Sequence, residues 1–315
     1  MEVIKLDAAQ SITPIENKEF SLAVGFFDGL HKGHQAVIRE AVREAEERQL
    51  LPAVMTFDPH PSHLFSKEDR KIGYITPLSE KERLLSDMGI DTLFIVTFDK
   101  ALADLSPARF VEDVLKKLNV RHVTAGFDFT FGSKGRGTME DMRQLGEGVF
   151  TAATVGKVAM DDEKISSTRI RGLLAEGKVS ETAELLGRPF RSVGTVTDGD
   201  KRGRLLGFPT ANIIPEDDLI VPKNGVYAVR FTVGGTVYDG VCNIGVKPTF
   251  DKPEEAKKTI EVNVFDFDGD LYGKEAAVDW IAFIRPEQKF GSIDDLKSQI
   301  GTDKETARAI LNDLD

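Results

Sequence analysis

The sequence predicts an α/β domain built on a parallel sheet, followed by a domain of antiparallel strands that forms a compact barrel. Its 315 residues exceed the length that one hydrophobic core usually fills, so two domains are expected. Up to about residue 186, strand-like apolar runs alternate with amphipathic segments, as in a parallel sheet covered by helices on both faces. Beyond that point short strand-like runs follow one another directly, which favours a barrel.

The first half supplies four predicted strands and three predicted helices. The strands are SLAVGFF, LPAVMTF, DTLFIVTF and RHVTAGFDF; the helices between them are HQAVIREAVREAEE, SEKERLLSDM and SPARFVEDVLKKL. Ligands of such folds bind at the carboxyl ends of the strands. We therefore predict a first domain, residues 1–186, with its ligand site at that edge of the sheet.

The second half, predicted as a domain of residues 187–315, has a different rhythm. Its strand-like runs are RSVGTVTDG, GVYAVRFTVGG, TVYDGVCNIGV, KTIEVNVFDF and AVDWIAFI, and glycine, proline and aspartate separate them. The last segment, SIDDLKSQIGTDKETARAILNDL, predicts one or two helices with Ser292 as N-cap. No internal repeat is evident, so the two domains are expected to be unrelated.

Composition narrows the class of protein. The chain is 41% hydrophobic and 30% charged, as in ordinary globular proteins, and its net charge of -11 argues against long nucleic acid as a partner. Cys242 is the only cysteine, which excludes an internal disulfide and a multi-cysteine metal cage and favours a core position. Neither a leader peptide nor a membrane span is evident, so we expect no membrane partner and a cytoplasmic location.

The run Asp28 to His34 connects the first strand to the first helix. Glycines in such a turn let the backbone approach a phosphate, and the helix N-terminus directs N–H groups at it. His31 and His34 can face the same way and add donors that stabilise charge on a phosphate in the transition state. A metal-binding pair is a weaker alternative, because zinc helices usually space histidines by four. Two surface histidines at a helix cap are the other alternative.

A second segment, Ile165 to Arg171, has hydroxyl side chains and two arginines at another predicted helix start. Such side chains also suit phosphate. Two segments of this kind in one α/β domain are stronger evidence than either segment alone.

The second domain contains a basic, glycine-rich stretch, GTVTDGDKRGRLLGFPTAN, from Gly194 to Asn212. Such a loop could close over a triphosphate, although an exposed hairpin is the simpler alternative for the stretch alone. The pattern GxxxxGK[ST] occurs nowhere in the chain, which excludes a P-loop kinase.

At the first site the sequence resembles a known family. GFFDGLHKGH with ISSTRIR resembles the paired signature of the adenylyl-transferring nucleotidyltransferases, and FDPHP and GFDFTFG are similar to the adenylyltransferase module of bacterial bifunctional riboflavin kinase/FAD synthetases. The resemblance implies a Rossmann-like domain with His31 and His34 as catalytic residues. It implies ATP contacts from Gly25, Phe27, Asp28, His31, Gly33, His34, Ser166, Ser167, Thr168 and Arg171. Phe57, Phe127 and Asp128 would contact flavin; phenylalanine faces suit a flat ring, although phenylalanines in strands are often core residues.

In the second domain GFPTAN matches the signature of the riboflavin kinase family, which implies a six-stranded antiparallel barrel with a terminal helix. By this resemblance Glu261 is the catalytic base, and Thr210 and Asn212 are ligands of the Mg²⁺ of MgATP, consistent with the preference of Mg²⁺ for oxygen. Asn263 departs from the histidine that many relatives have two residues after the base. The implied ATP contacts are Gly194, Gly199, Gly203, Arg204, Gly207, Pro209, Thr210 and Asn212.

Together the two resemblances predict a transferase that phosphorylates riboflavin to FMN and then adenylylates FMN to FAD, with ATP, riboflavin and FMN as small-molecule substrates. Three alternatives stay open at this stage. One is an adenylyl- or cytidylyltransferase for another phosphorylated precursor. Another is a relative with the adenylyltransferase activity alone. The third is a non-catalytic flavin-binding regulator that has kept the fold.

Overall fold

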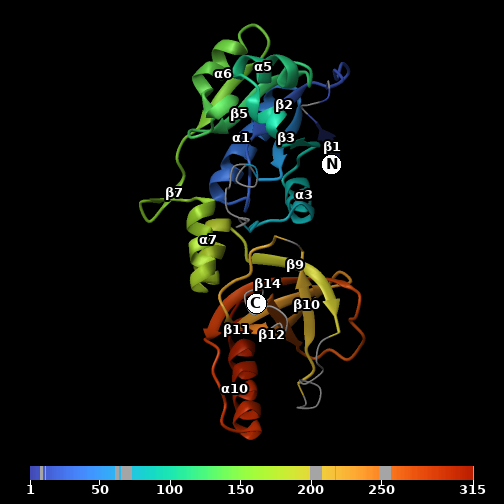
Figure 1. The fold of residues 1–315 in the computed structure, drawn as a ribbon, viewed down its shortest axis with the longest axis vertical. Coiled ribbons are helices and arrows are strands. Elements are labelled where there is room, and N and C mark those ends of the chain that lie inside the picture. Colours follow the sequence, from blue (N-terminus) through green and yellow to red (C-terminus); the bar gives the residue numbers. More distant parts are fainter. Residues whose placement is uncertain are drawn as a thin grey trace. The chain divides into compact units, whose positions relative to one another are not determined.

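The computed structural model describes residues 1–7, 10, 12–60, 64, 73–198, 208–216, 218–247 and 257–314. The chain forms two compact units (Figure 1). Unit 1 comprises Met1–Ile72 and Leu78–Ser166, and unit 2 comprises Gly73–Pro77 and Ser167–Asp315. The helices α7 (Ser167–Glu176) and α8 (Val179–Leu186) thus group with the barrel, because α8 packs on its strands β9 and β14. Residue 186 as the border between two activities stays a prediction.

Unit 1 is built on a six-stranded parallel sheet with the order β1-β4-β3-β2-β5-β6. The strands are β1 (Glu2–Leu6), β2 (Phe20–Val24), β3 (Leu51–Asp58), β4 (Thr92–Thr97), β5 (Val120–Gly126) and β6 (Thr151–Val155). The sequence patterns predicted β2 to β5 but missed the two edge strands. A small hairpin, β7 (Ala159–Met160) and β8 (Glu163–Lys164), follows the sheet.

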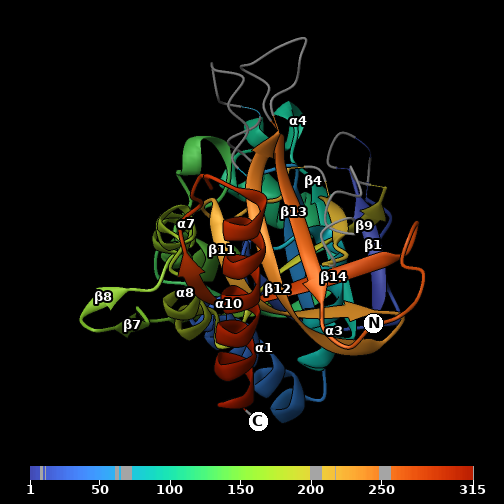
Figure 2. The same cartoon turned by 90° about the horizontal axis from the view of Figure 1, so that it is seen from below.

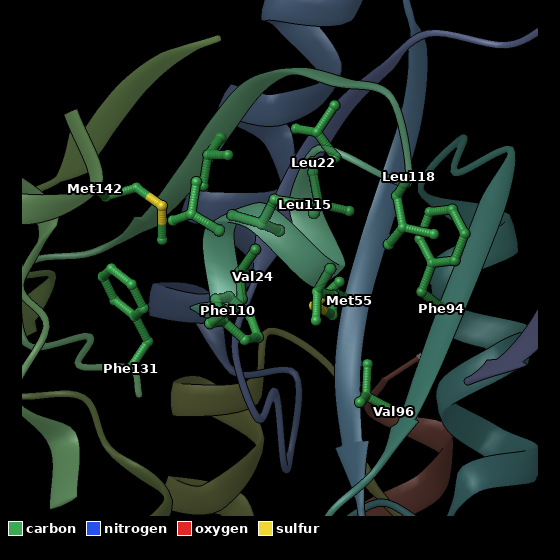
Figure 3. Packing of buried hydrophobic residues seen from close by; sticks show 14 of the residues in the cluster. Leu22, Val24, Met55, Phe94, Val96, Phe110, Leu115, Leu118, Phe131 and Met142 are labelled. Atoms are coloured by element: carbon green, nitrogen blue, oxygen red, sulfur yellow. The ribbon is translucent and has the colours of Figure 1, made fainter. Parts of the chain in front are cut away.

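Alternation along β2 divides the core of unit 1 into two layers. Leu22 and Val24 pack into one hydrophobic cluster, and Ala23 between them packs into another. The first cluster lies between the sheet and the segment around Phe110 and Leu115 (Figure 3). The second receives Val37, Ile38 and Ala41 from α1. Both faces of the sheet are therefore covered, as the alternation of strand and helix patterns predicted.

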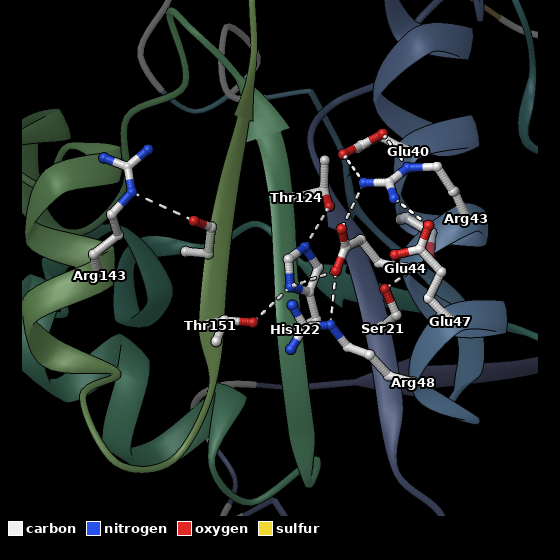
Figure 4. A network of polar contacts seen from close by, with 12 residues as sticks. Ser21, Glu40, Arg43, Glu44, Glu47, Arg48, His122, Thr124, Arg143 and Thr151 are labelled. Atoms are coloured by element: carbon white, nitrogen blue, oxygen red, sulfur yellow. Dashed lines mark hydrogen bonds and ion pairs between the residues drawn. The ribbon is translucent and has the colours of Figure 1, made fainter.

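The helical elements among the described residues of unit 1 are α1 (Lys32–Arg48), α3 (Leu78–Asp87), α4 (Lys100–Asp104), α5 (Pro107–Phe110), the short π-helix η1 (Val111–Leu115), the 3₁₀ helix η2 (Ser133–Gly135) and α6 (Met139–Leu145). A polar network links α1 to β5 and β6 (Figure 4). In it His122 lies 3.6 Å from the Glu44 carboxylate and 2.7 Å from the Thr151 hydroxyl. The network satisfies polar groups that α1 buries against the sheet.

The strands of unit 2 form a closed six-stranded antiparallel barrel, in the order β10-β13-β12-β11-β14-β9. Their bounds are β9 (Phe190–Thr197), β10 (Ala211–Pro215), β11 (Gly225–Val233), β12 (Thr236–Lys247), β13 (Lys257–Val264) and β14 (Glu275–Arg285). The barrel expected from the sequence is confirmed. Five of its strands match the five predicted runs, and the sixth, β10, begins inside GFPTAN.

One long helix, α10 (Ile293–Asn312), packs along β11, β12 and β14 (Figure 2). Ser292 caps it as predicted, because the Ser292 hydroxyl accepts a hydrogen bond of 3.1 Å from the Asp295 N–H. Its anchor is a bidentate ion pair between Arg285 of β14 and Asp303 of α10, with distances of 2.8 and 2.7 Å. The helix is thereby fixed in angle as well as in position.

Candidate active sites

The first candidate site lies where the strand order of unit 1 reverses. The chain passes from β2 to β3 on one side, whereas β5 lies on the other side of β2. In open parallel sheets ligands bind in the crevice at such a switch point, outside the carboxyl ends of the strands. The segments that leave those ends are 25–31 after β2 and 127–132 after β5, and both belong to the motifs singled out in the sequence.

His31 and His34 form a stacked pair at the N-terminus of α1. Their ring centroids are 3.6 Å apart, with 19° between the ring planes. His31 is also the N-cap: its Nδ1 accepts a hydrogen bond of 3.2 Å from the His34 N–H. An accepting Nδ1 leaves the proton of a neutral imidazole on Nε2. His31 therefore has an N–H donor at a helix N-terminus, where anions bind.

The environment keeps the second histidine neutral. Burial lowers the pKa of His34 well below its usual value, and the positive charges of Lys81 and Lys164 act in the same direction. Gly33 lies between the two histidines because a Cβ at this position would come within 3.2 Å of the His31 ring. Gly25 is constrained in the same way, since its Cβ would approach the Phe27 ring to 2.9 Å. These two glycines of the motif thus preserve the geometry of the loop.

Lys81 of α3 supports this loop from within unit 1. The side chain is only 4% exposed, and its ammonium donates to the Phe26 carbonyl and to the Thr56 hydroxyl, both at 3.1 Å. Burial lowers the pKa of Lys81, while Asp28 and Asp58 oppose that shift. Lys81 therefore connects the loop after β2 with the C-terminal part of β3.

The residues expected to contact flavin lie in two environments. Phe127 is 48% exposed, and the Lys164 ammonium lies 4.8 Å from the centre of its ring and also pairs with Asp128. Phe57 is half-buried and stacks on Phe26, with ring centroids 5.9 Å apart. An exposed aromatic face beside an ion pair suits a flat, polar ring system.

The segment Ile165 to Arg171, the second of the two predicted to bind phosphate, crosses the border between the two units. Ile165 and Ser166 end unit 1, whereas Ser167, Thr168 and Arg171 begin α7 in unit 2. Within unit 2 the Arg171 guanidinium donates to the Gly73 carbonyl at 3.2 Å. The joint action of this segment with His31 and His34 on one ATP stays a prediction.

The second candidate site is a cavity of about 380 Å³ in unit 2. Thr210, immediately before β10, and Glu261 of β13 line it, together with Phe208, Val226, Val241, Cys242, Asn243, Asn263, Arg285, Glu287, Gln288, Phe290, Leu296, Ile300 and Asp303. Asn212 of β10 pairs directly with Glu261 in the strand register. The barrel thus places the GFPTAN segment beside the predicted base.

The other predicted kinase residues are placed less completely. Gly199, Gly203, Arg204 and Gly207 lie outside the described residues. Gly194 in β9 has a structural explanation, because a Cβ there would lie 2.1 Å from the Ile214 carbonyl oxygen of the neighbouring strand. Burial raises the pKa of the Cys242 thiol well above its usual value, so Cys242 is an inert core residue, as predicted.

Comparisons with known proteins match both units. The model of the FAD synthetase family matches residues 13–169, and that of the riboflavin kinase family matches residues 186–311. The chain is 43% identical to the bifunctional riboflavin kinase/FMN adenylyltransferase of Bacillus subtilis, over 100% of this chain and 99% of the relative. The corresponding protein of Listeria monocytogenes is 44% identical over 93% of both chains.

The chain belongs to the family of bifunctional riboflavin kinases/FMN adenylyltransferases. It is a transferase that phosphorylates riboflavin to FMN and adenylylates FMN to FAD, with ATP as the donor in both reactions. The alternatives of a single activity, another precursor or a regulator are not favoured. Both families use ATP together with a divalent metal ion.

The fold agrees with a solved structure described as a macrolide-efflux protein from Streptococcus pneumoniae. It is 35% identical, covers 98% of this chain and 99% of its own, and has a TM-score of 0.87. Within the described part of this chain, no helix is long and apolar enough to cross a membrane.

The sequence analysis did not identify three charged residues that lie at the two candidate sites. Lys81 and Asp303 lie in helical segments rich in charge, and such segments usually face solvent. Lys164 follows an acidic run in the sequence, and nothing in its sequence neighbourhood points to Phe127 or Asp128. All three contacts join segments that are far apart along the chain, so local pattern could not reveal them.

Proposed function

We propose that the cavity in the barrel is the riboflavin kinase site and that Glu261 is its base. The observation that supports this best is the pairing of Glu261 with Asn212, beside the lining residue Thr210. The Glu261 carboxylate accepts the proton of the riboflavin 5′-hydroxyl as that oxygen bonds to the γ-phosphorus of ATP. The bond from the γ-phosphorus to the bridging oxygen breaks, and ADP leaves.

The donor set at this site fits Mg²⁺. Mg²⁺ takes oxygen ligands and usually keeps waters and substrate phosphates, so one or two protein oxygens suffice. The Thr210 hydroxyl and the Asn212 amide oxygen would supply them. Within the described part of the chain no group of three or more His, Cys, Asp and Glu residues could form an all-protein cage. When bound with ATP, the ion would neutralise charge that develops on the phosphates.

We also propose that the switch point of unit 1 is the FMN adenylyltransferase site. There a phosphate oxygen of FMN attacks the α-phosphorus of ATP, and pyrophosphate leaves. The His31 Nε2–H and the N-terminus of α1 stabilise the charge on the phosphates, and neutral His34 stacks on His31 and holds its ring. Phe127 and Asp128 would bind the flavin, and Ser166, Ser167, Thr168 and Arg171 would bind the ATP phosphates. No covalent intermediate with the protein is needed.

The experiment that tests the proposal follows flavins over time. We propose the cytoplasm as the location of the protein, so the purified protein is incubated with riboflavin, ATP and Mg²⁺ at cytoplasmic pH. The flavins are then separated chromatographically. FMN should appear first and FAD second. A variant His31→Ala should accumulate FMN without FAD. Formation of FAD by that variant at the wild-type rate would show that His31 has no role in adenylyl transfer.

A further inference from the structure

Asn263 lies at the edge of the cavity, two residues after Glu261 on the same strand. Successive odd positions of a strand share one face, so both side chains face the same way. Asn263 lines the cavity and is only 7% exposed. Its Nδ2 donates a hydrogen bond of 2.7 Å to the Pro209 carbonyl, immediately before Thr210 in the GFPTAN segment.

The oxygen of this amide receives no hydrogen bond from the described residues. The Asn263 Oδ1 atom is buried, and no group among the described residues of the barrel donates a hydrogen bond to it. Rotating the amide by 180° would not help, because it would place an oxygen 2.7 Å from the Pro209 carbonyl oxygen. The orientation is therefore fixed, and the buried oxygen has no donor among the described residues of the chain.

The chemistry of the reactants limits what that donor can be. The phosphates of ATP are acceptors near neutral pH and cannot satisfy an amide oxygen. A hydroxyl of the ribityl chain of riboflavin can, and so can a water bound to Mg²⁺. Both are O–H donors beside the bond that forms, given the position of Asn263 between Thr210 and Glu261.

The lining of the cavity agrees with a bound flavin. Phe290 before α10, and Leu296 and Ile300 on α10, contribute apolar side chains, whereas the segment before β10 contributes Thr210 and β13 contributes Glu261. A molecule with a flat ring and a chain of hydroxyls needs both kinds of surface. The polar side chains that β13 contributes, Glu261 and Asn263, can form hydrogen bonds with hydroxyls.

We propose that Asn263 is a substrate-contacting residue of the kinase site: its Nδ2 holds the Pro209 carbonyl, and its Oδ1 accepts a hydrogen bond from an O–H donor of the reacting complex. The inference rests on the proposed kinase role of the cavity. Histidine could take over this role from asparagine. A neutral imidazole likewise has one N–H donor and one acceptor nitrogen.

The test uses the full chain and two variants, Asn263→Leu and Asn263→His. Leucine has a similar volume but neither donor nor acceptor, whereas histidine has both. We expect Asn263→Leu to lower kcat/KM of FMN formation about tenfold to a hundredfold, the range for an unmade hydrogen bond at a buried group. Asn263→His should recover most of the loss. Adenylylation of supplied FMN, and fluorescence of Trp280, the only tryptophan, report that each unit has folded.

Two further arms identify the donor. Riboflavin analogues that lack one ribityl hydroxyl each are phosphorylated by the wild type and by Asn263→Leu. If the donor is a hydroxyl, the two proteins should have equal kcat/KM on the one analogue that lacks it. If the donor is a metal-bound water, the defect should be the same on all analogues and should appear as a higher Mg²⁺ requirement. Either result supports the proposal.

The proposal is overturned if folded Asn263→Leu phosphorylates riboflavin as efficiently as the wild type at every Mg²⁺ concentration. It is also overturned if Asn263→His is as impaired as Asn263→Leu while Trp280 fluorescence is unchanged. A wild-type protein that forms no FMN in the same assay would refute the kinase assignment of the cavity instead. The two failures are therefore distinguishable.

Discussion

Replacing Glu261 with glutamine should separate the two activities of one chain. Glutamine keeps the size of the side chain and leaves the pairing of residue 261 with Asn212 and Asn243 unchanged, because these pairs are backbone register. What is lost is proton acceptance. General base catalysis contributes roughly 10²- to 10⁴-fold, so kcat for FMN formation should fall by that factor. This corresponds to about 3–5 kcal/mol of activation free energy.

The assay measures both reactions on the same sample. FMN formation from riboflavin and FAD formation from supplied FMN are followed chromatographically, with the wild type as reference. The second rate should be unchanged, because Glu261 lies in the barrel and His31 and His34 lie in unit 1. Loss of both activities in a folded variant would refute independent sites. Retention of wild-type kcat for FMN formation would refute Glu261 as the base.

Three further predictions concern charged or titratable groups. Lys81→Met should lower adenylyl transfer by about 10²-fold, because a displacement of roughly 1 Å in a positioning loop has effects of this size, and should leave riboflavin phosphorylation unchanged. The free energy of unfolding of unit 1 should decrease as pH falls below about 6.5, the usual histidine pKa. Burial lowers the pKa of both His34 and His122, so the unfolded chain binds more protons in that range. Asp303→Ala should destabilise the barrel by about 3 kcal/mol, because it leaves Arg285 without its bidentate partner.

Each of these outcomes has a control. For Lys81, the exposed Lys100→Met should leave both rates unchanged, and equal loss of the two activities in Lys81→Met would point to global misfolding. Thermal unfolding between pH 5 and 7.5 tests the lowered pKa values of His34 and His122. A melting temperature of unit 1 that does not change over this range would contradict them. For Asp303, denaturant unfolding followed by Trp280 fluorescence is compared with the exposed Glu305→Ala, and equal midpoints would show that the ion pair contributes nothing.

The sequence predicted those parts of the fold that depend on local pattern. Strand-like apolar runs marked β2 to β5 and five barrel strands, and amphipathic segments marked α1 and α3. It failed where distant contacts decide the structure. The expected strand RHVTAGFDF ends at Gly126, where the Phe129 N–H bonds back to the Gly126 carbonyl at 3.0 Å and turns the chain. The expected helix SPARFVEDVLKKL changes from the α-helix α5 to the short π-helix η1 at Val111.

The candidate sites show the same division. His31, His34 and Glu261 could be found because their motifs are short and continuous. Lys81, Lys164 and Asp303 could not be found, because each acts on a segment many residues away. The orphan oxygen of Asn263 is a property of a packed environment. A sequence names the side chain but does not say whether its acceptor is satisfied.

The short segment Gly73–Pro77 has a consequence for how this gene can be divided. It lies between two parts of unit 1 along the chain, yet it belongs to the body of the barrel, where Tyr74 forms a bridge with Leu219. Any single scission of the polypeptide that leaves unit 1 whole removes this segment from the barrel. Splitting the gene into two independent enzymes would therefore require a replacement for the segment Gly73–Pro77 in the barrel, as well as a new start codon.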